Sequence, residues 1–244
     1  MKKIIIFILI LMVFQGLVGL EVPDLKGRVT DNANILNSDQ ELDIALDLQA
    51  AEQKTSAQVA LLIIPTLAGE NLEDFSMRVA EKWKLGQADR DNGALILIAL
   101  KEKKIRIEVG YGLESIITDL KSGYIIRNEF VPHFKKERFY QGIKQGVNAI
   151  TGLITKEYQI SRTELAKYRK QRQGANSSQF PFGFIVFIIF GILSLFGRRR
   201  RGLLLPFLFF GGRGGRGGGF GGFSGGGFSG GGGGFGGGGA SGGW

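Results

Sequence analysis

The sequence has 244 residues and a formal net charge of +9, but its charges are unevenly distributed. Residues 21–174 hold all 22 acidic residues and 23 of the 31 Lys and Arg residues, so this segment is close to neutral. A nucleic-acid-binding domain gathers positive charge on its folded part, so the composition argues against a nucleic-acid partner. The absence of Cys excludes disulfides, thiolate metal sites and a Cys nucleophile.

The first 20 residues have the pattern of a secretory signal peptide. Lys2 and Lys3 precede an unbroken apolar run over residues 4–13, and Gly16 and Gly19 supply small residues near a cleavage point. An uncleaved membrane anchor is the alternative interpretation. Both interpretations place the segment that follows outside the cytoplasm.

Residues 21–158 are expected to form one α/β domain. Its first stretch, residues 21–36, looks irregular. A helix is expected to begin at Ser38, which has an acid three residues later at Glu41, as a capping box requires. Residues 57–65 are a continuous apolar run that predicts a buried strand. Residues 71–84 predict a second helix with Asn71 as its cap, because its apolar residues recur with helical spacing.

The second half of this segment adds a hairpin and more helix. Residues 86–93 are expected to form a polar loop before a buried strand over residues 94–100. A charged turn then leads into a third strand that begins at Ile105 and is broken at Gly110. Two further helices are expected over residues 116–134 and 137–158. This order predicts a three-layer α/β/α domain on a small mixed sheet of three or four strands.

The segments that follow indicate a membrane. Residues 159–179 are polar and charged, as in a linker or a helical stalk. Residues 180–197 contain a 17-residue run without charge, which predicts a transmembrane helix, the alternative being a buried core helix. Residues 198–210 begin with four arginines, which by the positive-inside rule stay cytoplasmic, so the domain faces outward. A hairpin that returns the chain to the outer side is left open.

Residues 211–244 are glycine-rich, with 23 glycines among 34 residues. Such a segment cannot bury enough surface to offset its ordering entropy, so we expect a disordered tail. Arg213 and Arg216 lie near phenylalanines, as in segments that bind single-stranded RNA, but two arginines are too few. Contact with anionic lipid is the favoured interpretation.

Several carboxylates lie near predicted loops and form a candidate cation site. They are Asp31, Asp89, Asp91, Glu108, Glu114 and Asp119. Oxygen ligands in a chain with no Cys and one His favour Ca²⁺ or Mg²⁺ over Zn²⁺. The loop before the second strand is not an EF-hand, because Gly93 comes one position early and Leu100 stands where the bidentate Glu is needed. The alternative is that each acid is simply solvated.

Two other motifs in the sequence do not indicate a site. Gly110 and Gly112 flank Tyr111 after a strand, as in a dinucleotide-binding loop, but Ser115 replaces the third glycine and Glu114 would face a phosphate. No nucleotide cofactor is therefore expected. His133 is the only histidine, so a structural role is favoured over a catalytic triad or a multi-histidine metal site.

Three separate motifs, in order, resemble the signature of TPM-domain proteins. They are Val29-Thr30-Asp31, then Asp91-Asn92-Gly93, then residues 107–114 (IEVGYGLE) followed by Thr118-Asp119. The resemblance covers about residues 21–158, and the order of signal peptide, domain, membrane segment and glycine-rich tail also fits. Asp91 stands where Asn is frequent in this family, which keeps an oxygen in the loop.

The resemblance implies a Rossmann-like α/β/α domain. It also implies divalent-cation binding in some members and acid phosphatase activity in a thylakoid-lumen relative. Carried over by position, the cation site would involve Asp31, Asp91, Asn92, Glu114 and Asp119. The backbone around it would be shaped by Gly93, Gly110, Tyr111 and Gly112.

Two functions are compatible with this sequence. The first is a module on the outer face of the cytoplasmic membrane that binds a divalent cation and helps to maintain a membrane-protein complex. The second is a metal-assisted phosphatase, which would need positive groups around the transferred phosphoryl oxygens. Only Arg90, Arg106 and Lys121 are near, and no phosphate cradle is recognised, so the binding module is favoured.

Overall fold

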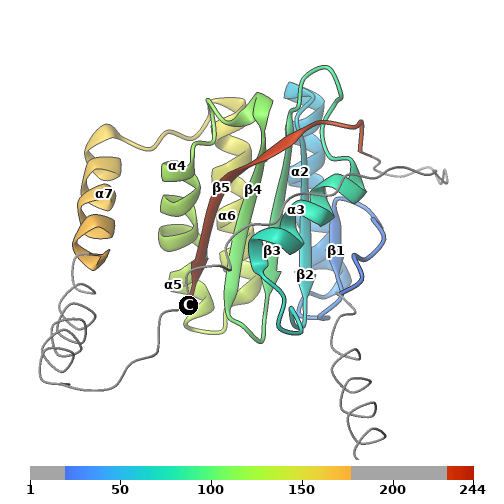
Figure 1. Cartoon of the computed structure of the whole chain (residues 1–244), viewed down its shortest axis with the longest axis horizontal. Coiled ribbons are helices and arrows are strands. Elements are labelled where there is room, and N and C mark those ends of the chain that lie inside the picture. The colour runs from blue at the N-terminus through green and yellow to red at the C-terminus, as the bar shows by residue number, and fades with distance from the viewer. Residues whose placement is uncertain (1–19, 177–229) are drawn as a thin grey trace, which may run out of the picture. The chain divides into compact units, whose positions relative to one another are not determined.

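A computed structural model describes residues 20–176 and 230–244, which are built around a mixed five-stranded sheet (Figure 1). In sheet order the strands are β1 (Val29–Asp31), β2 (Gln58–Ile64), β3 (Gly93–Ala99), β4 (Lys104–Gly110) and β5 (Phe235–Gly243). The first three are parallel, and β4 and β5 are each antiparallel to the strand before them. The predicted strands β2 to β4 are confirmed, whereas β1 lies in the stretch expected to be irregular.

The helices differ from the predicted ones at their ends, and one predicted helix contains a π-helical turn. They are α2 (Ser38–Thr55), α3 (Leu72–Trp83), α4 (Asp119–Ile125), the π-helical η2 (Ile126–Phe130), α5 (Val131–Phe134), α6 (Phe139–Thr155) and α7 (Arg162–Asn176), with a 3₁₀ turn η1 (Tyr111–Leu113) after β4. Asn37, not Ser38, caps α2: its side chain accepts from the Gln40 amide, and the Gln40 side chain accepts from the Asn37 amide. The helix expected over residues 116–134 begins at Asp119 and passes through the π-helical turn η2 just before Pro132, which has no N–H to continue the regular α-helical pattern.

Helices cover both faces of the sheet, which gives the expected three layers (Figure 1). On one face, α3 packs its Phe75 against alternate strand residues such as Leu62 and Leu97. On the other face, α2 and α6 pack together with Ile107 and the other strand residues of opposite orientation. Because successive strand residues point to opposite faces, continuous apolar strands such as β2 are buried on both sides.

The expectation of a disordered tail is wrong for its last part. Residues 235–243 form β5, which pairs with β4 through seven partner pairs from Lys104–Gly243 to Gly110–Phe235. By its composition this segment cannot build a hydrophobic core of its own. It needs none, because β4 already presents a row of backbone N–H and C=O groups at the sheet edge. Residues 211–229 lie outside the described residues.

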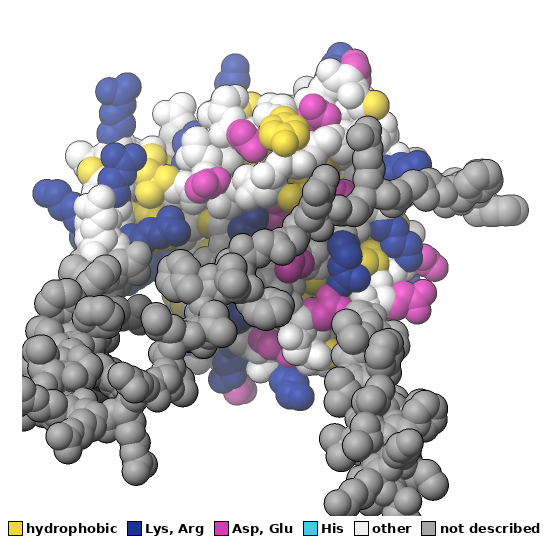
Figure 2. All heavy atoms as spheres, in the orientation of Figure 1, with side chains coloured by type: hydrophobic (Ala, Val, Ile, Leu, Met, Phe, Trp, Pro, Cys, Tyr) yellow, Lys and Arg dark blue, Asp and Glu magenta, His cyan; other side chains and the backbone are white. Residues whose placement is uncertain are grey.

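The predicted membrane segments cannot be placed on this fold. Residues 1–19, the 180–197 segment and residues 198–210 lie outside the described residues. Within residues 20–176 and 230–244, no helix is long and apolar enough to cross a membrane. The predicted linker or stalk contains α7. On the face seen in Figure 2, basic and acidic side chains both occur across the surface.

Candidate functional site

The direction of β4 divides the predicted site residues between two ends of the sheet. Asp31 pairs with Ile63 near the carboxyl end of β2, whereas Gly93 pairs with Gln58 at its amino end. These two positions are about 17 Å apart at ~3.3 Å per strand residue. Because β4 is antiparallel to β3, Gly110 at its carboxyl end lies at the Gly93 end of the sheet. The structure therefore separates Asp31 from the other predicted site residues.

Asp31 holds the loop that follows β1. Its Oδ1 accepts from the Ala33 amide at 2.8 Å, and its Oδ2 accepts from the Ile35 and Leu36 amides at 2.8 and 2.9 Å. Three N–H donors use both carboxylate oxygens, so this side chain stabilises the entry into α2. The geometry gives Asp31 a structural role in this state.

Asn92 likewise organises its own loop. Its Oδ1 accepts from the Gln87 amide at 2.8 Å, and its Nδ2 donates to the Ser56 carbonyl at 2.9 Å. Its side chain is buried, and both ends of the amide are bonded within the protein. Asn92 therefore joins the polar loop before β3 to the turn after α2.

The predicted site-shaping glycines let this loop approach the end of β4. A Cβ at Gly112 would lie 1.8 Å from the Arg90 carbonyl oxygen, and one at Gly110 would lie 2.4 Å from that of Asp91. A Cβ at Gly93 would lie 2.5 Å from the Leu85 carbonyl oxygen. The Gly112 amide donates to the Asp91 carbonyl at 3.0 Å. Glycine is needed at these three positions because any side chain would clash with backbone.

Three more of the predicted acids meet the C-terminal segment. The Asp119 carboxylate, at the start of α4, accepts from the Gly239 amide at 2.8 Å. The Asp91 carboxylate accepts from the Gly234 amide at 2.5 Å. Glu114 lies so close that a Cβ at Gly238 would be 2.5 Å from its Oε1. These acids therefore flank one extended chain, and two of them bind its backbone.

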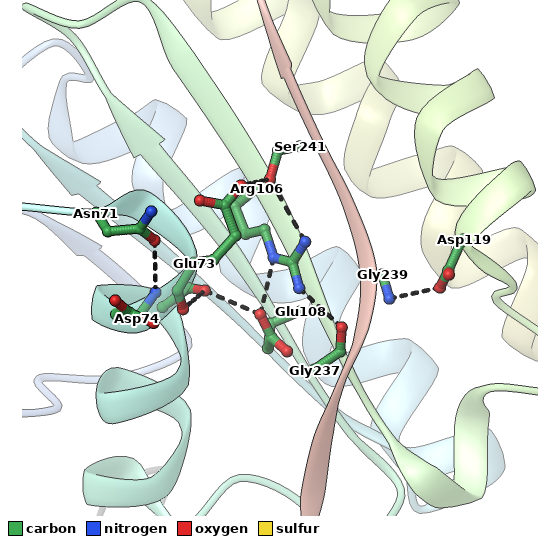
Figure 3. A network of polar contacts seen from close by, with 10 residues as sticks. Asn71, Glu73, Asp74, Arg106, Glu108, Asp119, Gly237, Gly239 and Ser241 are labelled. Atoms are coloured by element: carbon green, nitrogen blue, oxygen red, sulfur yellow. Dashed lines mark hydrogen bonds and ion pairs between the residues drawn. The ribbon is translucent and has the colours of Figure 1, made fainter. Parts of the chain in front are cut away.

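The opposite side of the same edge carries a buried ion pair (Figure 3). Arg106 Nε donates to Glu108 Oε2 at 2.8 Å, and Ser76 Oγ of α3 donates to the same oxygen at 2.9 Å. Glu108 is fully buried. The other guanidinium nitrogens reach β5: Nη2 donates to the Gly237 carbonyl at 3.1 Å and Nη1 to Ser241 Oγ at 3.4 Å. Arg106 thus links the domain core to β5.

Ser241 extends this network to α3. Its hydroxyl donates to Glu73 Oε1 at 2.6 Å, and this hydrogen bond holds the pKa of Glu73 below its ordinary value, against a smaller opposing effect of burial. Because the Glu73 pKa is lowered when Ser241 is in place, this hydrogen bond stabilises the pairing of β5 at pH values above the ordinary pKa of Glu. That contribution is lost as the pH falls through the lowered value.

The charged side chains considered for a cation or a phosphate make other contacts in this structure. Among the described residues, no group of three or more His, Cys, Asp or Glu side chains is placed to share a metal ion. The positive groups considered for phosphate are engaged elsewhere: Arg90 donates to Ser56 Oγ and Lys121 to the Ile116 carbonyl. His133 contacts Gln145 at 2.9 Å.

Sequence reasoning missed β5 and the residues that hold it. Phe235, Ala240, Ser241 and Trp244 interrupt the glycines of the last ten residues, and each contacts the domain. The Trp244 ring packs edge-on against Phe134, with centroids 4.8 Å apart. The available signal was the return of specific side chains at the end of a low-complexity run.

Removing the Asp31 carboxylate tests its structural role. Asp31→Ala leaves three loop amides without their acceptor, so we expect the free energy of unfolding to fall by about 1–3 kcal/mol. Chemical denaturation of the purified chain measures this loss. Asp89→Ala is the matched control, because the Asp89 side chain is 77% exposed and should change stability by less than about 0.5 kcal/mol. An unchanged Asp31→Ala stability would contradict the assignment.

Comparisons with known proteins agree with the fold. The family profile described as TPM domain matches residues 29–153, and no protein with a curated description matches the chain. The solution structure of the N-terminal domain of a P. gingivalis protein is 29% identical, covers 55% of this chain and 87% of its own, and has a TM-score of 0.50.

Two more distant solution structures are also similar. The BA42 protein of Bizionia argentinensis is 22% identical over 55% of this chain and 90% of its own, with a TM-score of 0.46. The N-terminal domain of the cg2496 protein of Corynebacterium glutamicum is 14% identical over 59% and 91%, with a TM-score of 0.43. The family match covers more than half of the sequence, so this chain belongs to the TPM-domain family.

Proposed function

We propose that this TPM domain is a binding module that accepts an extended polypeptide strand at the β4 edge. We define the β4 edge as the outer side of Lys104–Gly110 together with the flanking side chains of Asp91, Glu114 and Asp119. One observation carries the proposal: β4 and the Asp91 and Asp119 carboxylates bind backbone groups of an extended strand, here the chain's own C-terminal segment. Strand addition to a sheet edge is a recurring mode of peptide recognition.

The chemistry of the edge suits binding better than hydrolysis. The Asp91 and Asp119 carboxylates act as acceptors for backbone amides, and the Arg106 guanidinium is committed to Glu108 and to β5. A phosphatase would need free positive groups around the phosphoryl oxygens and a carboxylate that orients water. Acid phosphatase activity is therefore the less favoured alternative for this chain.

The setting we propose is the outer face of the cytoplasmic membrane. Its support comes from the sequence: the signal-like residues 1–20, and the uncharged run within residues 180–197 followed by arginines. A strand-binding domain held at a membrane would engage extended segments of other membrane proteins. This is an accessory role in maintaining a membrane-protein complex.

Peptide binding to a chain without its tail tests the proposal. The N-terminal domain of the P. gingivalis relative was determined alone in solution, so residues 20–176 should fold without the tail. We expect a synthetic peptide of residues 230–244 to give saturable amide shifts along β4 and at Asp91, Glu114 and Asp119.

The matched control is the same peptide with Gly239→Val. A Cβ at Gly239 would lie 1.9 Å from the Ile107 carbonyl oxygen, so this peptide should not bind. If the unmodified peptide gives no saturable shifts at millimolar concentration, the β4 edge is not a strand-binding site.

A divalent cation is a second candidate ligand of the β4 edge. It would bind when β5 is not paired with β4. The observation in its favour is that Asp91 and Asp119 would then lose the N–H donors of Gly234 and Gly239. Carboxylates freed in this way suit Ca²⁺ or Mg²⁺, because hard cations prefer oxygen ligands.

Competition between cation and peptide checks this second candidate. Ca²⁺ or Mg²⁺ added to residues 20–176 should shift the amides of Asp91, Glu114 and Asp119, and one equivalent of the 230–244 peptide should suppress these shifts. Shifts that persist unchanged with bound peptide would place the cation elsewhere. No shifts at millimolar cation would remove the candidate.

A further inference from the structure

In this structure the β4 edge is occupied by β5 of the same chain. Its glycines let the backbone of β5 lie close to the neighbouring residues. A Cβ at Gly238 would lie 2.5 Å from Glu114 Oε1, and one at Gly242 would lie 2.5 Å from Ile126 Cγ2. At Gly236 it would lie 2.3 Å from the Tyr111 ring. Gly239 also has a φ of +125°, a conformation that residues with side chains rarely adopt. The edge therefore requires glycine at Gly239, where backbone and φ both exclude a side chain, and favours small residues at the other three positions.

The side chains that do occur in this segment each have a matching contact. Ala240 is buried and packs on the apolar side with Ile107. Ser241, on the polar side, bridges Arg106 and Glu73 (Figure 3). Trp244 lies against the rings of Phe134 and Phe139. Phe235, at the other end, packs against the core cluster on the α3 side. Small residues on two faces and an aromatic residue at each end give the sequence a recognisable pattern.

We propose that residues 235–244 are an intramolecular ligand that closes the β4 edge and excludes other strands until it leaves. This inference rests on the proposed strand-binding function and names its specificity and regulation. The preferred external ligand is a glycine-rich extended segment in which two consecutive small residues, like Ala240 and Ser241, are followed by an aromatic residue, like Trp244. The chain's own segment competes with such a ligand at the high effective concentration of a tethered group.

The pairing also has a consequence for membrane topology. Residues 104–110 and 235–243 belong to one sheet, so they lie on the same side of any membrane. A single crossing between Asn176 and Gly230 would separate them. If the predicted segment over residues 180–197 spans the membrane, the proposal requires a second crossing before residue 230.

Disulfide cross-linking in the full chain tests the proposal, because the chain has no Cys of its own. Ile107 and Ala240 are directly opposed partners on the same face of the sheet. Opposed Cα atoms in antiparallel strands lie about 4.5–5.5 Å apart, which is within the Cα separation of a disulfide. We expect the Ile107→Cys, Ala240→Cys chain in isolated membranes to form an internal disulfide on oxidation and to remain a monomer.

Two matched chains serve as controls for the cross-link. Leu46→Cys with Ala240→Cys should not cross-link, because Leu46 is an exposed residue of α2. Adding Gly239→Val to the first pair should abolish its cross-link, because Val cannot take the conformation of Gly239. Absence of the cross-link in the first chain, or a cross-link that yields only dimers, would overturn the proposal.

Access of an external strand is the second readout. A tethered segment has an effective concentration of about 1 mM, so it should weaken binding of a labelled 230–244 peptide by about 10- to 100-fold when that peptide binds with a Kd of about 10–100 μM. The full Gly239→Val chain should therefore bind the peptide about 10- to 100-fold more tightly than the unmodified full chain. Equal affinity would overturn the closing role.

The outcomes separate this proposal from the function on which it rests. If the peptide binds the Gly239→Val chain but the cysteines of the full chain do not cross-link, the edge binds strands and the self-ligand is refuted. If the cysteines cross-link within the monomer but no peptide binds the Gly239→Val chain, β5 is a permanent strand. The strand-binding function is then refuted, and the closing role with it.

Discussion

The buried ion pair of Arg106 and Glu108 is the constraint on which the sheet edge depends. Glu108 is fully buried, and its Oε2 accepts from both Arg106 and Ser76. Leaving one member of such a pair without its partner costs about 3–5 kcal/mol. Arg106 has further N–H groups that need acceptors, and β5 provides them through Gly237 and Ser241. The charged core of β4 and the C-terminal strand are therefore one polar network.

Because of this network, the two faces of β4 pack against different kinds of side chain. Ile105, Ile107 and Val109 point into the apolar core with α2 and α6, whereas Arg106 and Glu108 point toward α3. A strand that covers β4 must match both faces. Consecutive Ala240 and Ser241 do this, because successive strand residues point to opposite sides. At the same edge, the Asp91 and Asp119 carboxylates accept from backbone amides, so they recognise an extended chain by its backbone.

Local sequence signals predicted the elements that local forces determine. The apolar runs of β2 and β3 and the Asn71-capped helix α3 needed no information from elsewhere in the chain. The three-residue β1 is too short to show an alternating pattern. The glycine-rich β5 has too few apolar side chains to form a core of its own, so its composition does not predict a strand. The structure places Asp31 at the other end of the sheet from the other predicted site residues, because β4 runs antiparallel to β3. The sequence predicts this hairpin, and the hairpin brings Gly110 to the amino end of β3.

Backbone hydrogen exchange of the full chain tests the central claim that β5 closes the β4 edge. Exchange measured by mass spectrometry would resolve the peptide that contains residues 235–243. If β5 pairs with β4 as in this structure, those amides should exchange at least about 100-fold more slowly than an unstructured glycine-rich chain. Exchange at the rate of an unstructured chain, with β3 still protected, would contradict the account.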